Sequence, residues 1–146
     1  MEADAYPDSS FLVSVHRADS RHEVARAFLD KNSLSLAFTP LHRIEVRNAL
    51  RNAVAGGDMT DSGCRLAFRQ IEEDLRDGFL IHTTIIWPDI FRRADQLSED
   101  HAASAGQRTI DLLHVAIALE AGAKTFLTFD QRQRKLARAA GLKVKP

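Results

Sequence analysis

The residues of this sequence that are best suited to chemistry are four carboxylates in unusual positions. Two of them, Asp8 and Asp130, each come directly after a predicted strand, near 3–7 and at 124–129. The carboxyl ends of parallel strands meet at one edge of a sheet, so we expect both carboxylates at that edge. Each could equally serve as the N-cap of the helix that follows, because Asp is among the residues preferred there. Position alone leaves both interpretations open.

Glu45 lies on a helix that is predicted to begin after Thr39 and to stop at Gly56-Gly57. It has no cation three or four positions away, since Arg43 and Arg47 are two positions away and face elsewhere. Glu45 falls at the border of the apolar arc of this helix, so we expect it to be drawn partly inward. A partly buried carboxylate needs compensation, and a metal ion is a common source of it. A glutamate that simply reaches water from the rim is the alternative.

Asp111 is in the first turn of the most apolar predicted helix, 110–119, in which only Asp111 and His114 are polar. A carboxylate there interacts favourably with the helix N-terminus, by about 0.3 to 1 kcal/mol. An acid that faced solvent would gain the same, whereas this one begins a helix that we expect to be buried nearly all round. We expect His114, one turn later, to pack inside the protein.

Together the four acids indicate a metal site. Four anions within a few ångströms repel one another, so without divalent cations the pKa of at least one should be raised. A ligand set of carboxylates, without Cys or paired His, suits Mg²⁺ or Mn²⁺. We therefore expect convergence at one edge of the sheet of Asp8, Glu45, Asp111 and Asp130.

The elements that position these acids alternate between strand and helix along the chain. We expect strands near 3–7 and at 34–38, 79–83, 124–129 and 142–145. Besides the helices already named, we expect helices near 10–15 and 20–31, at 60–77, from Pro88 to about His101, and at 131–140. Strands separated by such helices need crossover connections, which give a mostly parallel sheet covered on both faces. The predicted fold class is therefore a three-layer α/β/α sandwich, with 1–146 as a single domain.

Composition excludes several classes of protein. The 146 residues include 20 basic and 20 acidic ones, so the chain as a whole is not a polycationic binder of nucleic acid or membranes. Cys64 is the single cysteine and cannot form an internal disulfide, which indicates a reducing compartment. The apolar runs are too short to span a bilayer, and no cationic leader precedes Asp8. We expect a cytoplasmic protein without a membrane segment.

Four segments of the sequence resemble the PIN-domain family, in particular the VapC-like toxins of toxin–antitoxin pairs. They are 8–13 (DSSFLV), 39–45 (TPLHRIE), 108–116 (RTIDLLHVA) and 127–130 (LTFD). Order, spacing and surroundings all agree, and the resemblance covers essentially the whole chain. It implies a Mg²⁺- or Mn²⁺-dependent endoribonuclease whose acidic pocket is formed by the residues that match the four acids. It also implies a homodimer and a small VapB-like antitoxin whose C-terminal peptide covers the pocket.

The resemblance also assigns individual roles. The acid that matches Asp8 is a direct metal ligand in members of the family, and the Thr that matches Thr128 helps to order the pocket. Ser9 is expected to support it as well. Pro7 departs from a regular first strand because it has no N–H, so the strand should be shortened or lose a ladder bond.

An acidic pocket on a neutral protein needs separate basic patches to attract RNA. One candidate is a helical stripe of arginines spaced by four, and another is the basic stretch after Asp130. Solvated helix faces explain both patches equally well. The candidate RNA contacts are Arg43, Arg47, Arg51, Arg108, Arg132 and Arg134.

Other functions remain open at this point. An inactive PIN-like module that binds RNA or protein is the first alternative, which loss of an acid would have favoured. A metal-free ribonuclease would need two histidines as acid and base, and the six histidines form no recognisable pair in the sequence. A phosphotransfer domain would want a second Asp two residues after Asp8, where the chain has Ser10.

Overall fold

The computed structural model describes residues 3–101 and 106–146. The strands are β1 (Tyr6–Pro7), β2 (Leu36–Phe38), β3 (Leu80–His82), β4 (Thr125–Leu127) and β5 (Lys143–Lys145). The helices are α1 (Ser9–His16), α2 (His22–Asn32), α3 (Pro40–Ala55), α4 (Asp61–Arg76), α5 (Trp87–His101), α6 (Thr109–Glu120) and α7 (Gln131–Ala139). Every element that the sequence predicts is present, although the strands are shorter than their predicted ranges. Within the described part of the chain, no helix is both long enough and apolar enough to cross a membrane.

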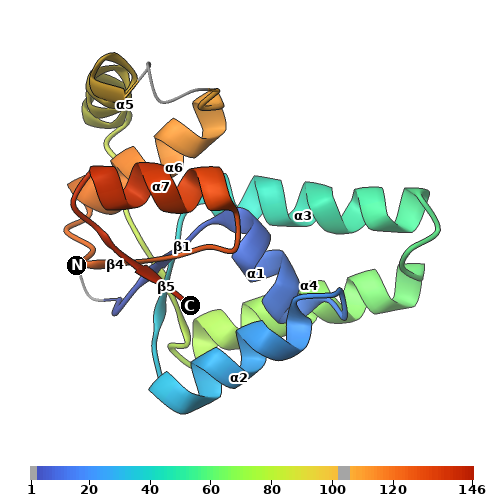
Figure 1. The fold of residues 1–146 in the computed structure, drawn as a ribbon. Coiled ribbons are helices and arrows are strands. Elements are labelled where there is room, and N and C mark those ends of the chain that lie inside the picture. The colour runs from blue at the N-terminus through green and yellow to red at the C-terminus, as the bar shows by residue number, and fades with distance from the viewer. Residues whose placement is uncertain (1–2, 102–105) are drawn as a thin grey trace.

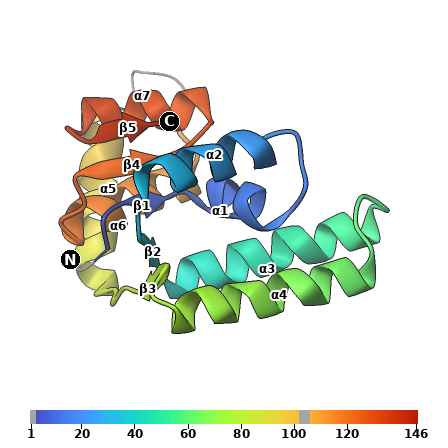
Figure 2. The same ribbon diagram turned by 90° about the horizontal axis from the view of Figure 1, so that it is seen from below.

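All strand pairs of the described residues are parallel. One set has the order β1-β4-β5, the other pairs β2 with β3, and a bridge between Ala5 and Leu36 joins the two sets. The order across the sheet is therefore β3-β2-β1-β4-β5, with β1 in the centre (Figure 2). The chain leaves β1 toward β2 on one side, while β4 adds on the other side. The carboxyl end of β1 is thus the switch point where ligands bind in sheets of this type.

Alternate strand residues enter two separate cores, which shows that helices cover both faces of the sheet. Tyr6, Ala37 and Phe126 face a core shared with α5, α6 and α7. Leu36 and Leu127 face a second core shared with α1, α2, α3 and α4. The pair α3 and α4 lies side by side and extends away from the sheet (Figures 1 and 2). The predicted three-layer fold is confirmed.

Pro7 is the second and last residue of β1, and its carbonyl bonds to the side chain of His42 instead of to β2. Ala5 bonds toward β2, because its carbonyl accepts from Ala37 N, so Pro7 faces the same side two residues later. The Pro7 carbonyl accepts a hydrogen bond of 2.8 Å from His42 Nε2. On the other side, Asp8 N still donates to Leu127 O at 2.9 Å. The strand is therefore shortened only toward β2, and the position of Asp8 remains fixed by β4.

Candidate active site

Asp8 lies at the switch point and is almost completely buried, with 7% of its surface exposed. It caps α1, because Oδ1 accepts from Phe11 N at 2.8 Å and from Ser10 Oγ at 2.9 Å. Oδ2 accepts from Thr128 Oγ1 at 2.5 Å. Capping and a place in the site are therefore not alternatives for Asp8. Thr128 thus holds one oxygen of this carboxylate.

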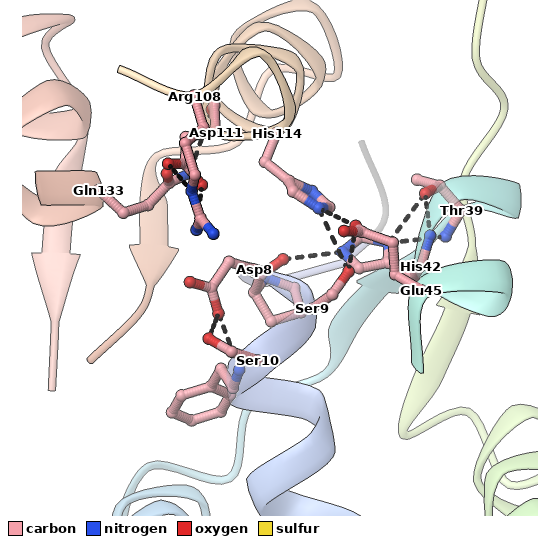
Figure 3. Close-up of polar contacts among 12 residues, drawn as sticks. Asp8, Ser9, Ser10, Thr39, His42, Glu45, Arg108, Asp111, His114 and Gln133 are labelled. Atoms are coloured by element: carbon pink, nitrogen blue, oxygen red, sulfur yellow. Dashed lines mark hydrogen bonds and ion pairs between the residues drawn. The ribbon is translucent and has the colours of Figure 1, made fainter. Parts of the chain in front are cut away.

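Glu45 has a side-chain partner that helix spacing could not reveal. Its Oε1 lies 2.5 Å from His114 Nε2 of α6 and accepts a 2.7 Å hydrogen bond from Ser9 Oγ of α1 (Figure 3). This partner lies outside the helix of Glu45, because His114 comes from 69 residues further along the chain. Glu45 itself is drawn partly inward as predicted, with 28% of its side chain exposed.

Asp111 is held by an arginine of its own helix start. Arg108 Nε and Nη2 donate to the two carboxylate oxygens of Asp111 at 3.0 and 3.1 Å. The Asp111 side chain is 10% exposed and that of Arg108 is 63% exposed. The main-chain carbonyl of Asp111 accepts a hydrogen bond from Gln133 Nε2 of α7. The carboxylate is therefore buried, whereas its partner can move into solvent.

Asp130 stands apart from the other three acids. It caps α7, with Oδ1 accepting from Gln133 N at 3.0 Å. Its backbone N–H donates to Thr128 Oγ1, so it contacts the residue that holds Asp8. Its negative charge is among those that raise the pKa of Arg108, after the larger effect of the bond to Asp111. Asp130 is thus near the site without lining its cavity.

One cavity of about 360 Å³ brings the other three carboxylates together at the carboxyl edge of the sheet. The side chains that line it with Asp8, Glu45 and Asp111 include Ser9, Ser10, Asp19, Arg108 and His114. A larger hollow of about 800 Å³ lies at the opposite edge, where Asp4, Ser35 and Phe79 precede their strands. Ligands of parallel α/β folds bind at the carboxyl edge, so the smaller cavity is the candidate site.

The donor chemistry of this cavity fits a hard divalent cation. Carboxylate and hydroxyl oxygens surround it, and these are the ligands that Mg²⁺ and Mn²⁺ prefer. In the part of the chain that the structure describes, no three acidic, His or Cys side chains stand close enough to hold one ion. Arg108 donates to both oxygens of Asp111, so a cation at this carboxylate would compete with the guanidinium.

Burial, and not the repulsion expected from the sequence, governs the pKa of Asp8. Desolvation raises the pKa of this carboxyl, and the bonds from Thr128 and Phe11 N and the nearby His114 only partly oppose it. Burial would raise the pKa of Glu45 too, but the hydrogen bonds from His114 and Ser9 oppose it, and the pKa of Glu45 is lowered. The two carboxyls therefore shift in opposite directions.

The structure also places two histidines side by side, against the expectation that none pair. The rings of His42 and His114 have centroids 5.2 Å apart. His42 Nδ1 accepts from Thr39 N and its Nε2 donates to Pro7 O. Burial lowers the pKa of His42 to about 3, so the ring is neutral and both nitrogens are occupied. His42 thus has a structural role, and an acid–base pair with His114 is excluded by its hydrogen bonds.

The arginine stripe of α3 packs against α4. Arg43 forms an ion pair with Glu72 at 2.6 Å, and Arg47 and Arg51 both lie over the ring of Phe68. After Asp130, two further arginines donate to main-chain carbonyls, Arg132 to Gly106 and Arg134 to Thr128. Of the six arginines considered for RNA contact, Arg108 is the one that lines the cavity.

Three supporting residues escaped the sequence analysis. Ser10 donates to Asp8, Tyr6 Oη lies 2.7 Å from His114 Nδ1, and His114 contacts Glu45. His114 carried a usable signal, because it is the one polar residue besides Asp111 within the predicted helix 110–119. Tyr6 gave no such signal, since a tyrosine in a buried strand is typical of a core residue.

Comparisons with known proteins agree with this geometry. The family model described as PIN domain matches residues 5–139, while the curated proteins give no match. The VapC20 toxin of Mycobacterium tuberculosis, which cleaves the sarcin–ricin loop, is similar over 97% of this chain and 99% of its own, with TM-score 0.66 and 17% identity. VapBC2 of Rickettsia felis, bound to a promoter DNA fragment, matches with a TM-score of 0.68 and 12% sequence identity. FitAcB of Neisseria gonorrhoeae matches with a TM-score of 0.66 and 16% sequence identity. Both of these matches cover 97% of this chain and 96% of the other protein's chain. The predicted family and fold are confirmed.

Proposed function

Because the chain belongs to the PIN-domain family, we propose that it is a metal-dependent endoribonuclease and the toxin of a VapBC-type toxin–antitoxin pair. The observation that carries the proposal is the cavity at the switch point, where Asp8, Glu45 and Asp111 come from three different elements. PIN domains are generally nucleases, and the similar solved structures belong to toxin–antitoxin systems.

Asp8, Glu45 and Asp111 are the residues that would hold Mg²⁺ or Mn²⁺, with Asp130 as a fourth, outer carboxylate. When bound, such ions activate water and stabilise the leaving oxygen of a phosphodiester. The protein's own contribution is orientation. Thr128 and Ser10 fix both oxygens of Asp8, and Ser9 fixes one oxygen of Glu45, so these ligands lose little freedom when a cation arrives.

Arg108 has a second role in this proposal. Its guanidinium balances Asp111 in the metal-free protein and, once a cation has taken Asp111, becomes free to bind an RNA phosphate. The other candidate arginines already have partners within the chain and would contribute weaker, additional contacts. A homodimer and a VapB-like antitoxin that covers the cavity complete the proposal.

The test is cleavage of a structured RNA by purified protein with Mg²⁺ or Mn²⁺, compared with EDTA and with Asp8→Asn. We expect metal-dependent cleavage that leaves 5′-phosphate and 3′-hydroxyl ends, because an activated water attacks phosphorus without the ribose 2′-OH. Induced expression should arrest growth, and Asp8→Asn should relieve the arrest. RNA binding without cleavage under any metal would favour an inactive binding module instead.

A further inference from the structure

A buried series of hydrogen bonds connects the central strand to the carboxylate of Glu45. Tyr6 Oη of β1 lies 2.7 Å from His114 Nδ1. His114 Nε2 in turn lies 2.5 Å from Glu45 Oε1, a contact that Figure 3 shows. Tyr6 is fully buried and His114 is 3% exposed, whereas the Glu45 side chain is 28% exposed. The series therefore runs from the core to the wall of the cavity.

The protons of this series have a definite direction. Burial, aided by the charges of Glu45 and Asp8, raises the pKa of Tyr6 well above 10, so the phenol keeps its hydrogen. A phenol that donates this hydrogen to His114 Nδ1 requires the ring hydrogen to be on Nε2, from which it is donated to Glu45 Oε1. The neighbouring His42 does not compete, because both of its nitrogens bond to the main chain.

The consequence for Glu45 is that its two oxygens differ. Oε1 accepts from His114 Nε2 and from Ser9 Oγ. Among the described residues, no hydrogen bond to Oε2 accompanies them. One oxygen is thus committed to the protein interior and the other is left for a ligand in the cavity.

We propose that Tyr6 and His114 are positioning residues that fix the Glu45 carboxylate for a divalent cation, and that His114 takes no part as an acid or base. The inference rests on the proposed function for the identity of the ligand. Metal-binding side chains commonly depend on such outer partners, whose loss costs about tenfold to a hundredfold in metal affinity. Here the dependent ligand is a carboxylate, and the partner is a histidine held in one tautomer by a buried phenol.

The first test is the affinity of the RNA-free protein for Mn²⁺, measured by calorimetry at pH 7. We expect His114→Leu to weaken binding by about tenfold to a hundredfold and Tyr6→Phe by less. His114→Gln should recover much of the loss, because an amide N–H can still donate to Glu45. His16→Leu is the matched control: it removes a buried histidine 2.7 Å from Asp74, outside this cavity, and should leave Mn²⁺ affinity unchanged.

A double-mutant cycle then asks whether His114 acts through Glu45. Adding His114→Leu to Glu45→Gln should cost little further affinity, because the residue that it positions has already been altered. An equal loss in both backgrounds would overturn the inference, as would wild-type affinity in His114→Leu. Far-ultraviolet circular dichroism of every variant verifies the fold.

The tautomer provides a test that needs neither metal nor a mutant. Long-range ¹⁵N–¹H correlation spectra of wild type at pH 7 should show His114 protonated at Nε2 and unprotonated at Nδ1. The reverse tautomer would overturn the proposed positioning role. If wild type binds Mn²⁺ and cleaves RNA while His114→Leu binds Mn²⁺ equally well, only the positioning role of Tyr6 and His114 is refuted. If wild type neither binds Mn²⁺ nor cleaves RNA, the proposed function is refuted, and the positioning role is refuted with it.

Discussion

The two halves of the candidate site are held in different ways. Asp8 and Glu45 receive hydrogen bonds from Thr128, Ser9 and His114, which are all buried. Asp111, on the other side of the cavity, is held by the largely exposed Arg108, and Asp130 serves as a helix cap beside it. We refer to Asp8 and Glu45 as the fixed half, and to Asp111 and Asp130 as the adjustable half.

This difference teaches where the site can change. Breaking a bond of the fixed half leaves a buried polar group without a partner, which is costly. Releasing Arg108 returns a largely exposed guanidinium to water, and a cation bound at Asp111 would replace it as the partner of that buried carboxylate. Cation binding should therefore leave the fixed half in place and rearrange the adjustable half.

The largest expected effect separates Asp130 from the acids that line the cavity. Asp8→Asn and Asp111→Asn should each reduce metal-dependent RNA cleavage by more than about a hundredfold, since losing a ligand should exceed the loss of its outer partner. Asp130→Asn should cost less, because Asn still caps α7 and the residue does not line the cavity. Initial cleavage rates at saturating Mn²⁺ provide the measurement. Equal losses in all three variants would mean that Asp130 moves into the cavity when metal binds.

Smaller effects are expected for Arg108→Ala, which should change Mn²⁺ affinity and RNA affinity in opposite directions. Without RNA, its loss frees Asp111, so Mn²⁺ affinity should rise by up to about fivefold, equivalent to about 1 kcal/mol. RNA affinity in the presence of metal should fall, and the slope of its logarithm against salt concentration should decrease by about one. Both quantities can be measured by titration, with fluorescent RNA for the second.

Arg92→Ala is the matched control for this variant. Arg92 also pairs with an acid three positions away, Asp89, but on α5 and outside the cavity. It should alter neither affinity. A fall of both affinities in Arg108→Ala would contradict the exchange between Asp111 and phosphate.

The smallest effect concerns stability within the fixed half, measured in EDTA by urea unfolding between about pH 3 and 7. The folded pKa of Asp8 is raised above its ordinary value of 3.8, so its contribution to stability falls as the pH rises from 3.8 through the raised value. The folded pKa of Glu45 is lowered below 4.5, so its contribution is present above 4.5 and is lost as the pH falls through the lowered value. As the pH rises, the free energy of unfolding of Asp8→Asn should increase relative to that of wild type. That of Glu45→Gln should decrease relative to wild type. Parallel curves for the three proteins would contradict both shifts.

The fold could be predicted from the sequence because its signals are local. Thr39 and Pro40 start α3 as predicted, with a capping box in which Thr39 and His42 bond reciprocally. The helix around Asp111 is buried as its apolar composition indicated. Strand ends were predicted less well, since β1 stops where Pro7 can no longer bond toward β2.

The partners within the site could not be predicted because they depend on long-range contacts. His114 and Glu45 are 69 residues apart, and Thr128 and Asp8 are 120 apart. Helix periodicity gave the direction of Glu45 correctly but not the side chain that meets it. The sequence likewise placed Asp130 directly after a strand. It did not indicate that residues of α1 and α6, and not Asp130, would line the cavity.

The junction between β1 and β2 has a mechanical consequence for the site. Asp8 follows β1, and Glu45 belongs to the helix that follows β2, so the fixed half straddles the place where the two strand sets meet at a bridge between Ala5 and Leu36. The Ala37 amide and the His42 imidazole bind across this seam, to Ala5 O and Pro7 O. These two hydrogen bonds therefore hold β1 and β2 together, and with them the distance between Asp8 and Glu45. The rate of amide hydrogen exchange at Ala37 would report how often the two strands separate.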